Sequence, residues 1–338
     1  MKQSVFVFLA IAASVVTLQS AQAQSNYRIT HTFHIASSGG WDYVAVNPAS
    51  NKLYASHGNQ VNILDKATGD SLGIIPNTSG VHGIAFDNAL GKGYTSNGRA
   101  NTVTVFDLKT DNILGQIPVG ENPDAIMYDE FSKKIVTCNG RSKDLTIIDP
   151  STDKVVATIA LRSKLETAVS DNAGKLYVNN EDKSEIDVID MNTHAILNRW
   201  PLAPGNGPSG LAIDLKTKRL FSTCDKLMVV MDATNGKIID KLAIGDGTDG
   251  AAFDPAYKLA FASNGEGTVT VVKEVSANEF KVLENVTTKK GARTIAIDET
   301  THKLYLLTAD FEPLHAGTTG LQRPKMIPGT FQVLVLEK

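Results

Sequence analysis

The chain has 338 residues, with 33 lysines and arginines against 36 aspartates and glutamates and a formal net charge of −3. This nearly balanced charge gives no electrostatic reason to expect nucleic acid or an anionic membrane as a partner. The two cysteines, Cys138 and Cys224, are too few for a fold built on disulfides.

The first 23 residues have the pattern of a secretory signal peptide. Lys2 is followed by an apolar run from Val5 to Leu18, and Ala21 and Ala23 form an A-x-A cleavage site. This run is too short for a membrane anchor, and no later apolar run is long enough to span a bilayer. We therefore expect a periplasmic or secreted protein without a membrane span, whose residues 24–338 form one domain.

A repeated segment organises the rest of the chain. Seven short apolar strands each end in an acidic or polar residue, and the ends are 40 to 44 positions apart. These end residues are Asn47, Asp87, Asp129, Asp171, Asp214, Asp254 and Asp298. Each is followed by a second strand such as "KLYAS", and in most units a third such as "VTVFD" and a fourth such as "ILGQIPVG" follow.

Four short strands in a unit of about 40 to 45 residues are typical of a β-propeller blade. We predict an all-β fold, a seven-bladed β-propeller of four-stranded antiparallel blades. A β-solenoid is the alternative, but its coils are usually shorter. The seventh unit has only three strands, whereas residues 26–35, "NYRITHTFHI", precede the first unit and alternate like a strand. We expect residues 26–35 to complete blade 7, which would close the ring and remove exposed sheet edges.

Several repeats share a D-x-x-T turn, which begins at Asp65, Asp107, Asp149 and Asp190. With the strand "KLYVNN", the exit "IPVG" and the Pro-Asp-Ala strand that follows it, the chain resembles the YVTN-repeat β-propeller family, which includes exported YncE-like proteins. The resemblance covers essentially the whole mature chain and implies the propeller fold. Blade 5 has "MDAT" and blade 6 has "KEVSANEF" instead, so we expect different turns there.

The repeated aspartates are better explained as turn residues than as a carboxylate site. An Asp or Thr side chain at the start of a hairpin binds nearby backbone N–H groups and stabilises the turn. A residue that recurs at the same place in the repeats serves the blade. We therefore look for function where the repeats differ.

The start of the innermost strand differs from blade to blade. In a four-stranded meander it lies at the mouth of the central channel, on the same face as the loops between second and third strands. Around the ring this position holds Asp42, His82, Asp124, Glu166, Ser209, Asp249 and Arg293. Trp41 lies beside the mouth, and Arg99 and Arg141 lie on flanking loops. We predict that these residues bind a ligand.

A long insert, residues 310–330, lies on the same face of the predicted ring, where other blades have short loops. Loops of this length in compact domains are commonly functional. It is either a lid over the mouth or a proline-containing surface loop packed on blade 7.

Four carboxylates at the mouth, with His82 beside them, suggest a cation site. The candidate ligands are Asp42, Asp124, Glu166 and Asp249, and such an oxygen-rich set suits calcium better than zinc. The alternative is that the mouth is polar only because water fills it. No paired cysteines or H-E-x-x-H motif are present. We therefore predict no cofactor and keep calcium as the alternative.

Enzyme signatures are few in this sequence. His57, His82 and His315 can reach the mouth face, but no recognisable nucleophile motif, G-x-S-x-G elbow or P-loop accompanies them. Cys138 and Cys224 end the second strands of blades 3 and 5, too far apart for a disulfide, so both should be free thiols.

Two functions remain after these exclusions. The favoured one is an exported monomeric binding or scaffold protein that uses the mouth face to bind a protein, peptide or glycan. The alternative is a calcium-dependent, lactonase-like hydrolase in which a channel-mouth calcium polarises a carbonyl. The sequence assigns no catalytic residue.

Overall fold

The structure is a computed structural model that describes residues 25–37, 39–313 and 325–338. The predicted signal peptide, residues 1–23, and His315 lie outside the described residues. Within these three ranges there is no helix long and apolar enough to cross a membrane.

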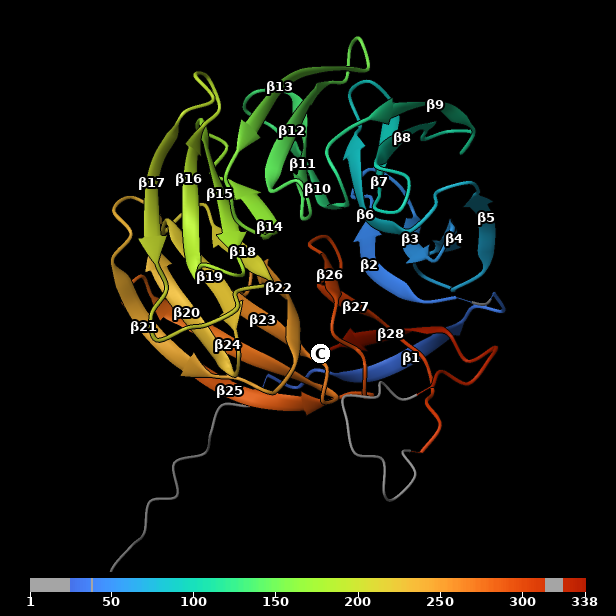
Figure 1. The fold of residues 1–338 in the computed structure, drawn as a ribbon. Coiled ribbons are helices and arrows are strands. Elements are labelled where there is room, and N and C mark those ends of the chain that lie inside the picture. Colours follow the sequence, from blue (N-terminus) through green and yellow to red (C-terminus); the bar gives the residue numbers. More distant parts are fainter. Residues whose placement is uncertain (1–24, 38, 314–324) are drawn as a thin grey trace, which may run out of the picture.

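The described strands form seven four-stranded antiparallel sheets arranged as a ring, as predicted (Figure 1). Blade 1 consists of β2 (Trp41–Val46), β3 (Lys52–His57), β4 (Gln60–Asp65) and β5 (Ser71–Ile75). Blade 2 consists of β6 (Val81–Asp87), β7 (Lys92–Asn97), β8 (Thr102–Asp107) and β9 (Ile113–Pro118). Blade 3 consists of β10 (Pro123–Asp129), β11 (Lys134–Asn139), β12 (Asp144–Asp149) and β13 (Lys154–Ala160). Blade 4 consists of β14 (Leu165–Ser170), β15 (Lys175–Asn180), β16 (Glu185–Asp190) and β17 (Ile196–Pro201). Blade 5 consists of β18 (Leu211–Asp214), β19 (Arg219–Cys224), β20 (Leu227–Asp232) and β21 (Ile238–Ala243). Blade 6 consists of β22 (Thr248–Asp254), β23 (Leu259–Asn264), β24 (Thr268–Ser276) and β25 (Glu279–Thr287). Blade 7 consists of β26 (Ile295–Asp298), β27 (Lys303–Thr308), β28 (Gln332–Glu337) and β1 (Arg28–His34).

The middle strands of each blade are buried on both faces, because each sheet is sandwiched between two neighbours. In β3 five consecutive residues, from Leu53 to His57, are buried, whereas most of the outer strand β5 is exposed. Apolar side chains from adjacent blades therefore form shared cores. One such cluster joins Cys138 and Leu145 of blade 3 to Leu165 and Val178 of blade 4. Burial of this kind is the main favourable contribution to folding.

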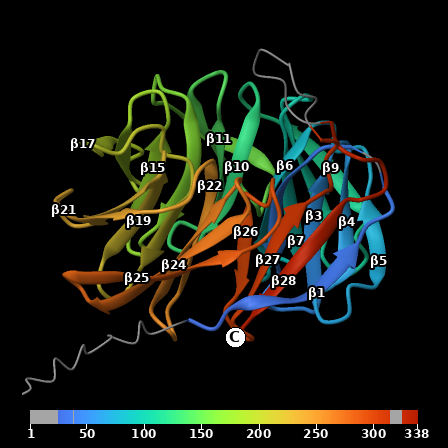
Figure 2. The same cartoon turned by 90° about the horizontal axis from the view of Figure 1, so that it is seen from below.

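The first strand of the described chain lies in the same sheet as the last one. β1 pairs antiparallel with β28, from Arg28 opposite Glu337 to His34 opposite Gln332 (Figure 2). The side chain of Phe33 packs into the core shared by blades 7 and 1. The ring of Tyr27 meets Phe261 of blade 6 edge to face at 5.3 Å. Residues from the N-terminal segment thus contact both neighbours of blade 7.

The repeated aspartates hold turns on the face opposite the mouth. Asp65 Oδ1 accepts hydrogen bonds from the backbone N–H groups of Ala67 and Thr68, and Asp107 binds the equivalent groups of its own turn. These backbone hydrogen bonds lower the pKa of both carboxyls. The expectation of a different turn in blade 5 is wrong. Asp232 of "MDAT" accepts hydrogen bonds from the backbone N–H and the hydroxyl of Thr234, and its carbonyl accepts from Gly236 N–H as Asp65 accepts from Gly69.

The turn of blade 6 differs from the others, as expected. The sequence "KEVSANEF" extends β24 and β25 to nine residues each, a longer hairpin than in the other blades.

Candidate functional site

The mouth residues from six of the seven blades form two groups of close contacts. Asp42, His82 and Asp124 from blades 1 to 3 connect through Arg293 of blade 7 to Asp249 of blade 6. Glu166 of blade 4 makes its contacts with other residues, and Ser209 of blade 5 points elsewhere. The seven predicted mouth residues therefore do not form one continuous ring of contacts.

His82 lies between two carboxylates. Its Nδ1 atom is 2.6 Å from Asp42 Oδ2 and 3.7 Å from Asp124 Oδ1. One ligand atom from each of the three residues lies within 4.8 Å of the other two. All three side chains are partly open to solvent. This group, Asp42, His82 and Asp124, is called the mouth triad below.

Arg293 joins the mouth triad to Asp249. Its Nε atom is 2.5 Å from Asp249 Oδ2, and its Nη2 atom is 3.5 Å from Asp42 Oδ1. Arg293 precedes β26, which begins only at Ile295. The expectation that Arg293 starts the innermost strand is therefore wrong. Its position in the preceding loop places the guanidinium between blades 6 and 1.

Glu166 is paired within its own blade. Lys164 Nζ is 2.9 Å from Glu166 Oε1 and also binds Glu181 on the loop after β15. Sequence reasoning missed both partners because neither lies at the repeated mouth position. Lys164 is only two residues before Glu166, and the "NEDKS" loop after a second strand contains Glu181.

Burial raises the pKa values of three acids at the mouth, Asp124, Asp249 and Glu166. Burial raises the pKa of Asp124 to about 7, although the neighbouring His82 opposes the rise. Burial also raises the pKa of Asp249, with Arg293 opposing. The pKa of Glu166 is raised by burial and by its contact with Glu181. The mouth therefore disfavours negative charge and favours groups that bring positive charge or hydrogen-bond donors.

The pKa of His82 is raised. Burial alone would lower it, but the hydrogen bond to Asp42 and the charges of Asp124 and Asp42 outweigh burial.

Four other residues that the sequence analysis named do not take part in these contacts at the mouth. Ser209 is buried before the start of β18 and donates its hydroxyl to the Thr248 carbonyl. His57 is buried against Phe331, and its ring bonds Gly39 and Ser37, so it does not face the mouth. Arg99 and Arg141 are exposed on loops.

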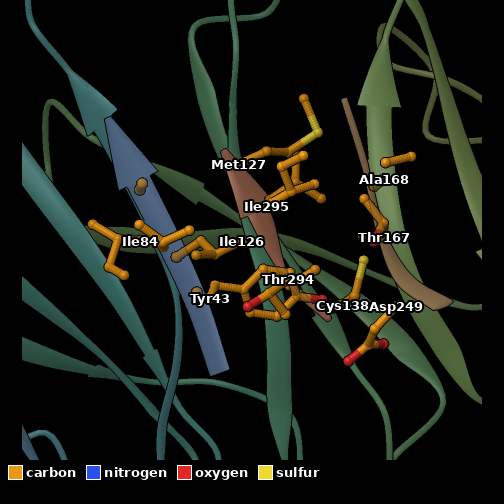
Figure 3. A pocket seen from close by; sticks show the side chains of 17 residues that line it. Tyr43, Ile84, Ile126, Met127, Cys138, Thr167, Ala168, Asp249, Thr294 and Ile295 are labelled. Carbon is orange, nitrogen blue, oxygen red and sulfur yellow. The ribbon is translucent and has the colours of Figure 1, made fainter. Parts of the chain in front are cut away.

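Tyr43 crosses the channel below the mouth triad. It belongs to β2 of blade 1 but packs against the core shared by blades 3 and 4. The cavity that it lines has a volume of about 180 Å³ and also includes Thr294, Cys138 and Asp249 (Figure 3). Burial and the surrounding carboxylates, Asp124 first, raise the pKa of the Tyr43 phenol, so it stays neutral. Tyr43 therefore forms a floor to the mouth.

A signal for this floor was present in the sequence. The residue after each mouth position is small in six blades, and only blade 1 has a large one. In chain order these residues are Tyr43, Gly83, Ala125, Thr167, Gly210, Gly250 and Thr294. Six of these residues, all except Gly210, line the cavity.

An aromatic pocket adjoins the mouth. It has a volume of about 630 Å³ and is lined by Trp41, Phe311 and Met326 together with Asp249 and Arg293. The Trp41 ring lies 5.9 Å from that of Phe311. Because Asp249 and Arg293 belong to both the ring of charges and this pocket, the two are continuous.

The ends of the long insert help to form this pocket. Phe311 and Met326 are paired in an isolated β-bridge. Gly291, at a φ of 84°, approaches the Phe311 ring so closely that a Cβ there would lie 2.9 Å from it. The lid hypothesis concerns residues 314–324 as well, and these lie outside the described residues.

Comparisons with known proteins support the fold. No model of a protein family matches the sequence, and no curated protein matches it either. Among solved structures 1708 chains match, so this architecture is widely shared and by itself identifies no activity. One of them is Kuenenia stuttgartiensis hydrazine synthase, with a TM-score of 0.70 and 15% sequence identity over 81% of this chain and 94% of that chain. At this identity the similarity concerns the fold alone. The fold is compatible with a binding or scaffold role.

Proposed function

We propose that this protein is an exported binding protein that holds a protein, peptide or glycan at the channel mouth. The observation that carries the proposal is the pocket shared by Trp41, Phe311, Arg293 and Asp249. An aromatic surface beside a few polar groups suits a sugar ring or a peptide side chain, since the aromatic face supplies contact area and the polar groups supply orientation.

Tyr43 supports a binding role as well. It lies directly after Asp42 in the chain, and its ring lines the cavity that Asp249 also lines. Its neutral phenol adds no charge to the cavity and keeps a hydrogen-bond donor.

The alternative, a calcium-dependent hydrolase, has less geometric support. Calcium takes six to eight oxygen ligands. Of the four predicted carboxylates, Asp249 is engaged by Arg293 and Glu166 by Lys164. Asp42 and Asp124 both contact His82, so an imidazole lies between these two carboxylates.

The binding role is tested by screening the mature protein against a glycan array and a peptide library. The mouth variant carries Phe311→Ala and Arg293→Gln. The matched control carries Phe131→Ala and Lys133→Gln, an aromatic and a cation exposed on the opposite face. We expect the mouth variant to lose at least tenfold in affinity for whatever the wild type binds, with the control unchanged. Loss in the control alone would place the site on the other face.

Export is tested separately, by N-terminal sequencing of protein recovered from the periplasm of a Gram-negative host. We expect the mature chain to begin at Gln24. An uncleaved chain in the cytoplasm would contradict export without affecting the binding site.

A further inference from the structure

We propose that the mouth triad, Asp42, His82 and Asp124, binds one divalent transition-metal ion of the zinc type. Its three donors come from three consecutive blades and converge on one point of the mouth. The proposal does not rest on the binding role proposed above, because it concerns the ion alone.

The separations fit a small ion better than a large one. Nitrogen and carboxylate ligands lie about 2.0 to 2.2 Å from zinc, which places two ligands of a tetrahedral site about 3.4 Å apart. The His82 Nδ1 atom is 2.6 Å from Asp42 Oδ2 and 3.7 Å from Asp124 Oδ1. A change of less than about 1 Å therefore brings each of these two separations to the tetrahedral value.

The charge of the mouth matches a divalent ion. Arg293 makes its shorter contact with Asp249, and Lys164 forms ion pairs with Glu166 and Glu181. Asp42 and Asp124 then share His82 as their common partner. A protonated imidazole supplies one positive charge, whereas two carboxylates and a neutral imidazole balance a doubly charged ion.

The donor set selects among ions. An imidazole nitrogen with two carboxylates suits zinc and other transition metals, whereas calcium needs more oxygen ligands than the triad provides. Three protein ligands leave a coordination position for water or a ligand group. The triad side chains are partly exposed at the mouth, so that position is accessible from outside.

A glycine approaches the imidazole of the mouth triad closely. A Cβ at Gly98 would lie 2.6 Å from His82 Nε2, so only glycine leaves room for the ring there. Gly98 directly follows β7 of the same blade, in the turn before β8, and its substitution would displace the histidine.

The test uses untagged mature protein, stripped of metal with a chelator and dialysed against Zn²⁺, Mn²⁺ or Ca²⁺ in separate arms. Metal content is measured by elemental analysis and affinity by titration calorimetry. We expect one zinc per chain and binding of calcium at least tenfold weaker. His82→Gln and, independently, Asp124→Asn should each weaken zinc binding at least tenfold. His34→Gln is the matched control, since His34 is exposed on β1, and it should bind zinc like the wild type.

A second readout is the visible absorption of bound Co²⁺, which reports coordination by the protein directly. We expect ligand-field bands in the wild type and in His34→Gln, and their loss in both triad variants. Fewer than about 0.2 zinc ions per chain in the wild type, or unchanged binding in both triad variants, would overturn the proposal. Tighter calcium than zinc binding would overturn the choice of ion class and restore the oxygen-rich site.

Discussion

The Nδ1 atom of His82 lies 2.6 Å from Asp42 Oδ2, although the two residues are 40 positions apart and belong to neighbouring blades. One repeat length therefore separates two residues whose side chains meet. The contact exists because the equivalent positions of adjacent blades lie side by side around the channel, and it connects the repeat period to the chemistry of the mouth.

The stability of the protein should fall as the pH rises through neutrality. Burial raises the pKa of Asp124 from 3.8 to about 7, so the folded state holds a proton that the unfolded state releases near pH 4. The raised pKa of His82 acts in the same direction, because its contribution is present below about pH 6.5 and is lost above. The Asp124 shift corresponds to at most about 4 kcal/mol, and partial exposure reduces this to about 2 kcal/mol.

This prediction is checked by urea unfolding at pH 5 and pH 8. The wild type should lose about 2 kcal/mol or more between them, and Asp124→Asn should remove about half of that loss. Asp107→Asn, in a turn on the opposite face, should leave the loss unchanged. An Asp124→Asn protein with the full wild-type loss would show that this carboxyl is not the titrating group.

The N-terminal strand should be essential to stability. Phe33 is 6% exposed and packs in the core between blades 7 and 1. Phe33→Ala should cost about 3 to 4 kcal/mol of unfolding free energy, from lost burial and the cavity left behind. His34→Ala, on the exposed face of the same strand, should change it by less than about 0.5 kcal/mol. Equal effects of the two changes in urea unfolding would contradict the packing of β1.

The two cysteines should be free and unreactive in the folded protein. Cys138 lies in β11 and Cys224 in β19, both buried and unpaired in the structure as described. Burial raises the pKa of Cys224 to about 11 and that of Cys138 further, so little thiolate forms at neutral pH. Thiol titration without reductant should find two thiols per chain in denaturant and none within minutes in the native state. A count of zero in denaturant would reveal a disulfide.

The architecture was predictable from the sequence because it depends on local sequence patterns. The period of 40 to 44 residues, the short apolar strands and the turn aspartates are each visible within one repeat. These patterns predicted seven blades of four strands. They also predicted that Cys138 and Cys224 lie apart, because the position of each strand follows from counting along the repeats.

The arrangement of the mouth was decided only by the tertiary structure. The repeats put seven polar residues at equivalent positions but did not show that His82 would bind Asp42, that Glu166 would pair with Lys164, or that Ser209 would turn away. Nor did they show that Tyr43 would cross the channel. Such contacts depend on side-chain reach across the ring and on where each inner strand begins. Both are set by the packing of blades against one another, which no single repeat contains.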